Sequence, residues 1–212
     1  MSDELNGPYA NLVKSLGFSD PTCIYPTGLG WHTPARSIIY AATDSDGQDV
    51  TIKLEPPAWL IPSDGELDGL TPADMLRNEF MMLQRAKHVP VVPRARRLYA
   101  SLSEHPEDLR AYGRNPRNQA APITALAKTY MSGTHPPSFG DCLDELTQAV
   151  TMLHDNGIAN LDLNPRNVLV DSGRVVVLDL GIAQSFEDWG AAFQEFIDHD
   201  NYKIHQFSSM DE

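Results

Sequence analysis

The chain has 212 residues, 42% of them hydrophobic, and a formal net charge of −13 from 29 acidic and 16 basic residues. An acidic surface repels phosphate and anionic lipid, which argues against general nucleic-acid or membrane binding. No apolar run approaches the roughly 20 residues that a membrane helix needs, and the first residues lack the basic and apolar regions of a signal peptide. Cys23 and Cys142 have no metal-ligand spacing, so we expect no disulfide framework and a reducing, cytoplasmic location.

The early part of the chain has helix and strand patterns in succession. Residues 8–18 have the apolar spacing of a short amphipathic helix. Residues 24–54 predict antiparallel strands, because residues 49–55 alternate in polarity and Asp46-Gly47 suits a tight hairpin turn.

A loop and a second helix follow. Residues 56–70 contain three prolines and two glycines, which predicts a loop. A helix is expected over 71–88, because Thr71 and Asp74 have the spacing of a capping box and Pro72 suits the first helical position.

The middle of the chain predicts strands at 90–101 and 123–131, separated by a polar loop at 102–122. Basic residues concentrate here, and residues 72–133 carry ten basic and five acidic residues, a net charge of +5. A solvated loop explains such a run most simply. The functional alternative is a docking patch for an acidic protein partner, over the segment from Arg94 to Arg117.

The last third is mainly helical. Residues 139–155 have a broad apolar stripe of helical period. A hairpin is expected over 167–180, and a final helix from Ser185. Strands that precede helices in this way predict an α+β fold in two lobes.

The segment from Asn160 to Gly181 contains the clearest chemical signal. It places Asp162, Asn167 and Asp179 at loop or strand-end positions, and the hairpin between Asn167 and Asp179 is long enough to bring the two together. Two carboxylates and a carboxamide supply the hard oxygen ligands that Mg²⁺ prefers.

This segment resembles the catalytic and metal-binding loops of the protein-kinase-like superfamily. The family pattern is H-R-D-x-K-P-x-N, a hairpin and D-F-G. The chain has N-L-D-L-N-P-R-N, a hairpin and D-L-G. Upstream, VTIK ending at Lys53 resembles the strand that bears the family lysine, and Glu79 resembles its helical glutamate partner. Gly28 and Gly30 resemble the start of the glycine-rich loop.

The resemblance implies a two-lobe kinase-like fold in a single domain, with an N-lobe and hinge over about 20–133 and a minimal C-lobe over 134–212. It implies an enzyme that uses ATP and Mg²⁺ to phosphorylate an alcohol group. Its implied catalytic residues are Asp162, Lys53 and Glu79. The implied metal ligands are Asn167 and Asp179, and Tyr130 and Met131 are the residues implied to lie near the adenine.

The chain departs from the family pattern in ways that affect function. Asn160 and Leu161 replace the H-R pair, Asn164 replaces the loop lysine, and Thr33 replaces the third glycine. Only 31 residues follow Gly181, with no A-P-E motif, so we expect a truncated helical C-lobe without the usual peptide platform.

These departures resemble small atypical members: RIO-type kinases, the kinase of the tRNA-threonylcarbamoylation complex and lipopolysaccharide-core kinases. Three functions stay open. The first is an atypical serine/threonine-protein kinase, which includes self-phosphorylation. The others are a kinase of small molecules or sugars, and a nucleotide-binding, ATPase-like regulatory module that acts through a partner.

Overall fold

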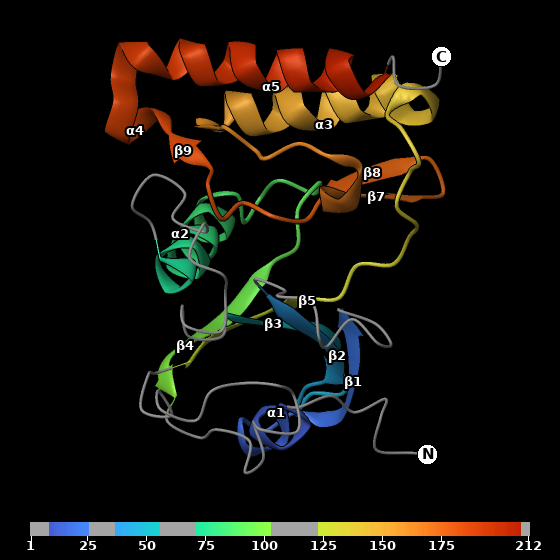
Figure 1. Ribbon diagram of the computed structural model, residues 1–212, viewed down its shortest axis with the longest axis vertical. Coiled ribbons are helices and arrows are strands. Elements are labelled where there is room, and N and C mark those ends of the chain that lie inside the picture. Colours follow the sequence, from blue (N-terminus) through green and yellow to red (C-terminus); the bar gives the residue numbers. More distant parts are fainter. Residues whose placement is uncertain (1–8, 26–36, 56–70, 103–122, 209–212) are drawn as a thin grey trace, which may run out of the picture. The chain divides into compact units, whose positions relative to one another are not determined.

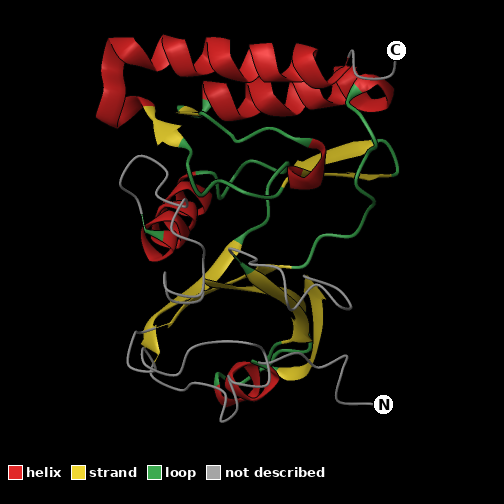
Figure 2. Ribbon diagram, viewed as in Figure 1, coloured by secondary structure: helices red, strands yellow, loops and turns green. Residues whose placement is uncertain are grey.

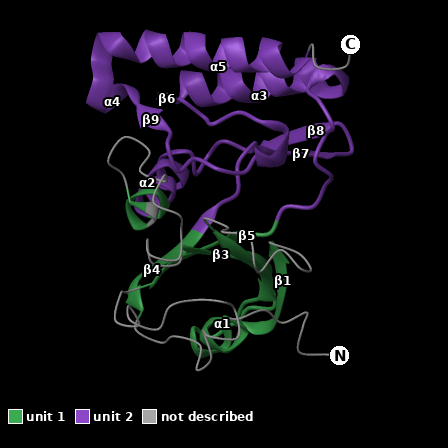
Figure 3. Cartoon of the chain, in the orientation of Figure 1, with its two compact units in different colours: residues 1–76, 96–130 green, residues 77–95, 131–212 purple. Residues whose placement is uncertain are grey.

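The computed structural model describes residues 9–25, 37–55, 71–102 and 123–208. These residues form two compact units, coloured separately in Figure 3. Unit 1 comprises residues 1–76 and 96–130, and unit 2 comprises residues 77–95 and 131–212. None of the helices in the described ranges is long and apolar enough to span a bilayer.

Unit 1 is built on one antiparallel sheet. Its five strands are β1 (Ser19–Tyr25), β2 (Ile38–Thr43), β3 (Asp49–Glu55), β4 (Ala95–Leu102) and β5 (Ile123–Thr129). They lie in the order β1-β2-β3-β5-β4 (Figure 1). The predicted turn at Asp46-Gly47 joins β2 to β3 in regular register, because Asp44 accepts hydrogen bonds from the backbone of Asp46 and Gln48.

The core of unit 1 lies between the sheet and α1 (Ala10–Ser15). Val50, Ile52 and Leu54 of β3 are fully buried in it, as their alternation predicts. Lys53, on the opposite face of β3, is also buried, with only 5% of its surface exposed.

Unit 2 is mostly helical (Figure 2). Helix α3 (Leu143–Asp155) follows a short 3-10 turn, η5 (Gly140–Cys142), and buries the predicted apolar stripe. It lies beside α5 (Phe193–Ser208), as Figure 1 shows. The predicted hairpin consists of β7 (Val168–Asp171) and β8 (Arg174–Val177). Together the units make an α+β protein, compatible with a small two-lobe kinase-like fold.

Helix α2 (Pro72–Arg85) begins with the predicted capping box. The Asp74 amide donates to Thr71 Oγ1 at 3.2 Å, and the Thr71 amide donates to Asp74 Oδ2 at 3.2 Å. The division between the units falls inside this helix, after Leu76. Residues 77–95 cluster with unit 2, and the predicted division into an N-lobe and hinge over about 20–133 and a minimal C-lobe over 134–212 stays a prediction.

Several boundaries differ from prediction. Helix α2 ends at Arg85 rather than at 88, and α1 is shorter than the predicted 8–18. The first strand begins at Ser19, ahead of the predicted meander, because tertiary pairing with β2 overrides Asp20 and Pro21. Strand β4 begins two residues after Pro93, which lacks an amide for the ladder. Strand β5 ends at Thr129 rather than at 131.

The predicted final helix is broken into two. Ser185 caps α4 (Phe186–Trp189), then Gly190 adopts a φ of +53° at the start of the 3-10 turn η7 (Gly190–Ala192), and α5 follows. A helix cannot continue through that backbone conformation. The predicted loops at 56–70 and 102–122 lie outside the described residues, apart from Leu102.

Candidate functional site

Asp162 lies in a loop that follows α3 and the two-residue strand β6 (Ile158–Ala159). Its φ is +46°, an uncommon conformation for a residue with a side chain. Asn167 holds this conformation from the other end of the loop. Its Nδ2 donates to the backbone oxygen of Asp162 at 3.0 Å and to Oδ2 of its carboxylate at 3.1 Å.

Asn164 is also used inside this loop. Its Nδ2 donates to Asp162 O at 2.9 Å, and its Oδ1 accepts from the amide of Arg166 at 3.1 Å. The second bond caps the single 3-10 turn η6 (Pro165–Asn167). Both ends of the Asn164 amide are therefore engaged in shaping the loop, whereas the Arg166 side chain is exposed.

The β7–β8 hairpin returns the chain to this loop, as its length predicted. The Leu178 amide donates to Asn167 O at 2.9 Å, so Asp179 follows directly after a contact with the loop. The Gly181 amide then donates to Asp179 Oδ1 at 2.9 Å, which fixes the carboxylate orientation. Asp162, Asn167 and Asp179 thus belong to one hydrogen-bonded assembly within unit 2.

Asn78 ties helix α2 to the same assembly and was not singled out from the sequence. Its Nδ2 donates to Gly181 O at 3.0 Å and to Ala183 O at 2.9 Å. Glu79 is the next residue and its side chain is fully buried. A burial this deep is unusual for a glutamate, and a carboxylate is rarely buried without partners.

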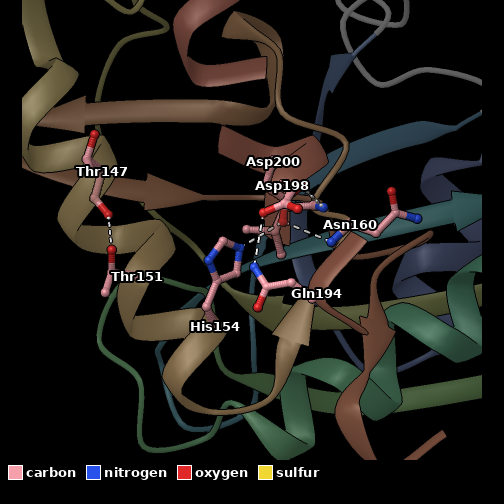
Figure 4. A network of polar contacts seen from close by, with 8 residues as sticks. Thr147, Thr151, His154, Asn160, Gln194, Asp198 and Asp200 are labelled. Carbon is pink, nitrogen blue, oxygen red and sulfur yellow. Dashed lines mark hydrogen bonds and ion pairs between the residues drawn. The ribbon is translucent and has the colours of Figure 1, made fainter. Parts of the chain in front are cut away.

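Asp200 of α5 is the second residue that sequence reasoning missed. It is fully buried, and Figure 4 shows it beside His154 and Asn160. Its Oδ2 accepts from the Asn160 amide and from His154 Nε2, each at 2.9 Å, and its Oδ1 accepts from the Leu161 amide at 2.9 Å. Asp200 therefore anchors the two residues that precede Asp162.

A sequence signal for Asp200 exists in hindsight. Phe193, Ile197, Asp200 and Ile204 follow one another at the spacing of a single helix face. An aspartate on an otherwise apolar face marks a buried carboxylate that needs donors. Two of the donors come from a loop about 40 residues away and the third is His154 of α3, so the signal predicts the burial but not the partners.

Among the described residues, Lys53 and Tyr130 are the predicted site residues that belong to unit 1. Lys53 lies in β3, and its Nζ is 3.9 Å from Glu55 Oε1 on the same strand. Tyr130 is 44% exposed, and its amide donates to Asp49 O at 3.1 Å. The division between the units falls between Tyr130 and Met131. Gly28 and Gly30 lie outside the described residues.

The basic segment is described only in part. Arg96 Nη1 is 4.0 Å from Asp44 Oδ2, and the Arg97 guanidinium lies 4.9 Å from the centre of the Tyr99 ring. Both arginines therefore have contacts within unit 1. Arg110, Arg114 and Arg117 lie outside the described residues, so the predicted docking patch stays a prediction.

The donor set of the assembly suits a hard cation that keeps some of its water. In the part of the chain that the structure describes, no three His, Cys, Asp or Glu side chains cluster as metal ligands. The assembly instead offers carboxylates and an amide. Because Asn167 Nδ2 points at Asp162, the amide oxygen of Asn167 is directed away from it.

Comparison with known proteins gives short local similarities. No protein-family model matches the chain. A stretch of 45 residues, 21% of the chain, is 44% identical to Serine/threonine-protein kinase AtPK1/AtPK6 of Arabidopsis thaliana and to AtPK2/AtPK19 of the same plant. A stretch of 44 residues is 41% identical to the probable serine/threonine-protein kinase irlE of Dictyostelium discoideum.

The aligned stretches cover 10% of each plant kinase and 3% of irlE. These similarities support a protein-kinase-like relationship, confined to about a fifth of the chain. They are consistent with kinase activity in general and carry no information on a subfamily.

Proposed function

We propose that the chain is an ATP- and Mg²⁺-dependent phosphotransferase of the small atypical kinase type, with a protein serine or threonine hydroxyl, including its own, as the acceptor. The observation that carries the proposal is the assembly of Asp162, Asn167 and Asp179, in which the two loops are hydrogen-bonded to each other. The order of these residues matches the kinase-like motifs, and the local similarities to serine/threonine kinases agree with it.

In this proposal each residue has a separate role. Asp162 accepts or orients the proton of the acceptor hydroxyl. Asn167 and Asp179 supply the oxygens that hold Mg²⁺, which neutralises charge on the transferring phosphoryl group when bound. Lys53 holds the nucleotide phosphates, Glu79 orients Lys53, and Gly28 and Gly30 cover the phosphates. Tyr130 and Met131 flank the adenine.

Asn164 stands at the position of the family's loop lysine but does not supply its positive charge. The Asn164 amide is engaged at both ends within the loop. We propose that the exposed guanidinium of Arg166 contributes the positive charge near the γ-phosphate instead, because it extends from the same single turn.

A specific observation favours a small molecule or sugar as the alternative acceptor. Only residues 182–192 separate Gly181 from the start of α5, and β9 (Gln184–Ser185), α4 and η7 occupy most of them. Ordinary protein kinases place an activation loop and an A-P-E motif after the D-F-G glycine. So short a segment leaves little chain to hold a peptide.

Transfer from radiolabelled ATP in the presence of Mg²⁺ tests the proposal. We expect label on the protein itself or on a generic protein acceptor such as casein. Asp162→Asn should reduce transfer about 10²–10⁴-fold, the range for loss of a general base, and leave Mg²⁺-ATP binding within about twofold. Asp179→Asn should weaken Mg²⁺-ATP binding itself, because it removes a metal ligand.

Asp171→Asn is the matched control, since Asp171 is an exposed aspartate on the same hairpin that accepts from Ser132. It should leave transfer unchanged. Label that appears only on sugars or other small alcohols would favour the alternative acceptor. ATP hydrolysis without transfer would favour the regulatory module, and unchanged binding and transfer in both site variants would refute the site.

A further inference from the structure

Unit 2 has a groove that the proposed chemistry does not use. It encloses about 370 Å³ between the C-terminal end of α3 and the start of α5. Its apolar lining comes from Gly157, Phe186, Gly190, Ala191, Phe193 and Ile197. This lining belongs to helices and turns, so the groove exposes side chains rather than the edge of a sheet.

Two exposed aromatic side chains, Phe186 in the groove lining and Trp189 next to the lining residue Gly190, each pack against a second ring. Phe186 is 56% exposed and packs edge-to-face on Phe193, with ring centres 5.8 Å apart. Trp189, 47% exposed, packs in the same way on Phe196 at 5.1 Å, and its indole N–H donates to Gln184. Exposed, immobilised aromatic rings of this kind are typical of protein interfaces.

The polar wall of the groove is also preformed. His154 lines it, and its Nε2 is bonded to the buried Asp200. Gln194 lines it and donates to Asp198 Oδ1 at 3.0 Å (Figure 4). Because these side chains are already ordered, they lose less conformational entropy when a ligand binds in the groove.

The charged residues near the groove are mainly acidic. Residues 175–202 contain six acidic residues and no lysine or arginine. The exposed acids near the groove are Asp155, which lines it, with Glu187, Asp188, Glu195 and Asp198. Arg85 of α2 pairs with Glu187 at 2.7 Å and neutralises one of them.

We propose that this groove is a docking site for a basic amphipathic helix of a partner protein. Apolar residues on one face of that helix, spaced i, i+3 or i+4, enter between Phe186 and Ile197. Lysine and arginine on its flanks face the acidic rim, which speeds association and makes it sensitive to salt. The inference concerns a surface outside the proposed catalytic assembly and does not depend on phosphoryl transfer.

Selection from a display library of random peptides, each about four helical turns long, tests the proposal on the full chain. We expect enriched peptides to be net positive with apolar residues at helical spacing. A synthetic copy of the strongest peptide should bind the chain with a Kd in the micromolar range. It should bind several-fold more weakly at about 0.5 M salt than at about 0.1 M, because salt screens exposed charges.

Two variants locate the binding surface. Phe186→Ala should weaken peptide binding at least about tenfold, as loss of an aromatic anchor does. Asp155→Lys should also weaken it, and this variant is compatible with folding because a lysine at the end of α3 suits the helix dipole. The matched controls are Tyr202→Ala, an aromatic that is 63% exposed outside the groove, and Asp46→Lys in the β2–β3 turn. Both controls should bind normally.

Several results would overturn the inference. The selection could enrich acidic or uncharged peptides, or neither groove variant could weaken peptide binding. Tyr202→Ala could also weaken peptide binding as much as Phe186→Ala does. A dimer in sedimentation experiments that Phe186→Ala dissociates would also overturn it, because the groove would then hold a second copy of the chain.

Discussion

At the residue scale, Asp200 shows how one buried carboxylate organises a loop. It accepts hydrogen bonds from two consecutive backbone amides and from His154. Asn160 then adopts a φ of +60°, and Asp162 a φ of +46°. Such conformations persist only where the surroundings hold them, which is the role that the contacts of Asp200 and Asn167 perform.

Asp200→Ala should therefore destabilise the protein strongly. A buried amide left without an acceptor costs about 1–3 kcal/mol, so two such amides should lower the free energy of unfolding by at least about 2 kcal/mol. Urea unfolding followed by circular dichroism measures this. Asp198→Ala is the control, because Asp198 is exposed on the same helix and accepts from Gln194; its change should stay within about 0.5 kcal/mol. Equal losses in the two variants would contradict the anchoring role.

At the element scale, the backbone of residues 131–134 packs closely against β7, and this packing restricts which residue can occupy position 133. Thr134 and Val170 exchange two backbone hydrogen bonds, at 3.0 and 2.9 Å. Gly133 precedes this bridge with a φ of +136°, and a Cβ added there would lie 2.8 Å from Val170 O. The bridge therefore requires glycine both for its conformation and for its space.

Gly133→Ala should disrupt this bridge, and Gly173→Ala in the β7–β8 turn separates the two causes. Gly173 has a φ of +75°, and a Cβ added to it would meet no other atom within 4 Å, so it is subject to the conformational cost alone. That cost is about 1–2 kcal/mol. We expect Gly133→Ala to lose more stability than Gly173→Ala in parallel thermal or urea unfolding. An equal or smaller loss would show that the strand pair moves apart freely.

At the scale of the whole molecule, we expect the half-buried thiol of Cys23 and the buried thiol of Cys142 to make stability depend on alkaline pH. Burial raises the pKa of Cys23 from 9.0 to about 11. Burial, with the nearby charges of Glu145 and Asp141, also raises the pKa of Cys142 above 9.0. Both groups keep their protons longer in the folded chain than in the unfolded one.

The raised pKa values contribute stability that is fully present below pH 9. Above that pH the unfolded chain releases thiol protons first, so the free energy of unfolding should fall as the pH rises from 9 towards 11. Urea midpoints at about pH 8, 9.5 and 10.5 would measure the slope. Cys23→Ser with Cys142→Ala should flatten it. If the slope is unchanged in this double variant, other groups cause the loss of stability at alkaline pH. Tyr99 is one such group, because its pKa is raised mainly by burial.

The sequence by itself determined the local elements. The Thr71–Asp74 capping box, the alternation of β3, the apolar stripe of α3 and the hairpin of residues 168–177 all lie where residue spacing predicted them. Their signals have periods of about two to four residues, so a short window contains them. The order of Asp162, Asn167 and Asp179 was also readable, because all three belong to one continuous segment of the chain.

Only the tertiary structure decided which polar groups are buried and what they bind. Lys53 and Glu79 are buried although their local patterns suit solvent. Asn78 and Asp200 find partners 105 and 40 residues away in the sequence. The break at Gly190 follows from a backbone conformation that the apolar spacing of residues 186–197 does not reveal. Such contacts form between segments distant in the chain, and their free energy depends on desolvation that no local pattern records.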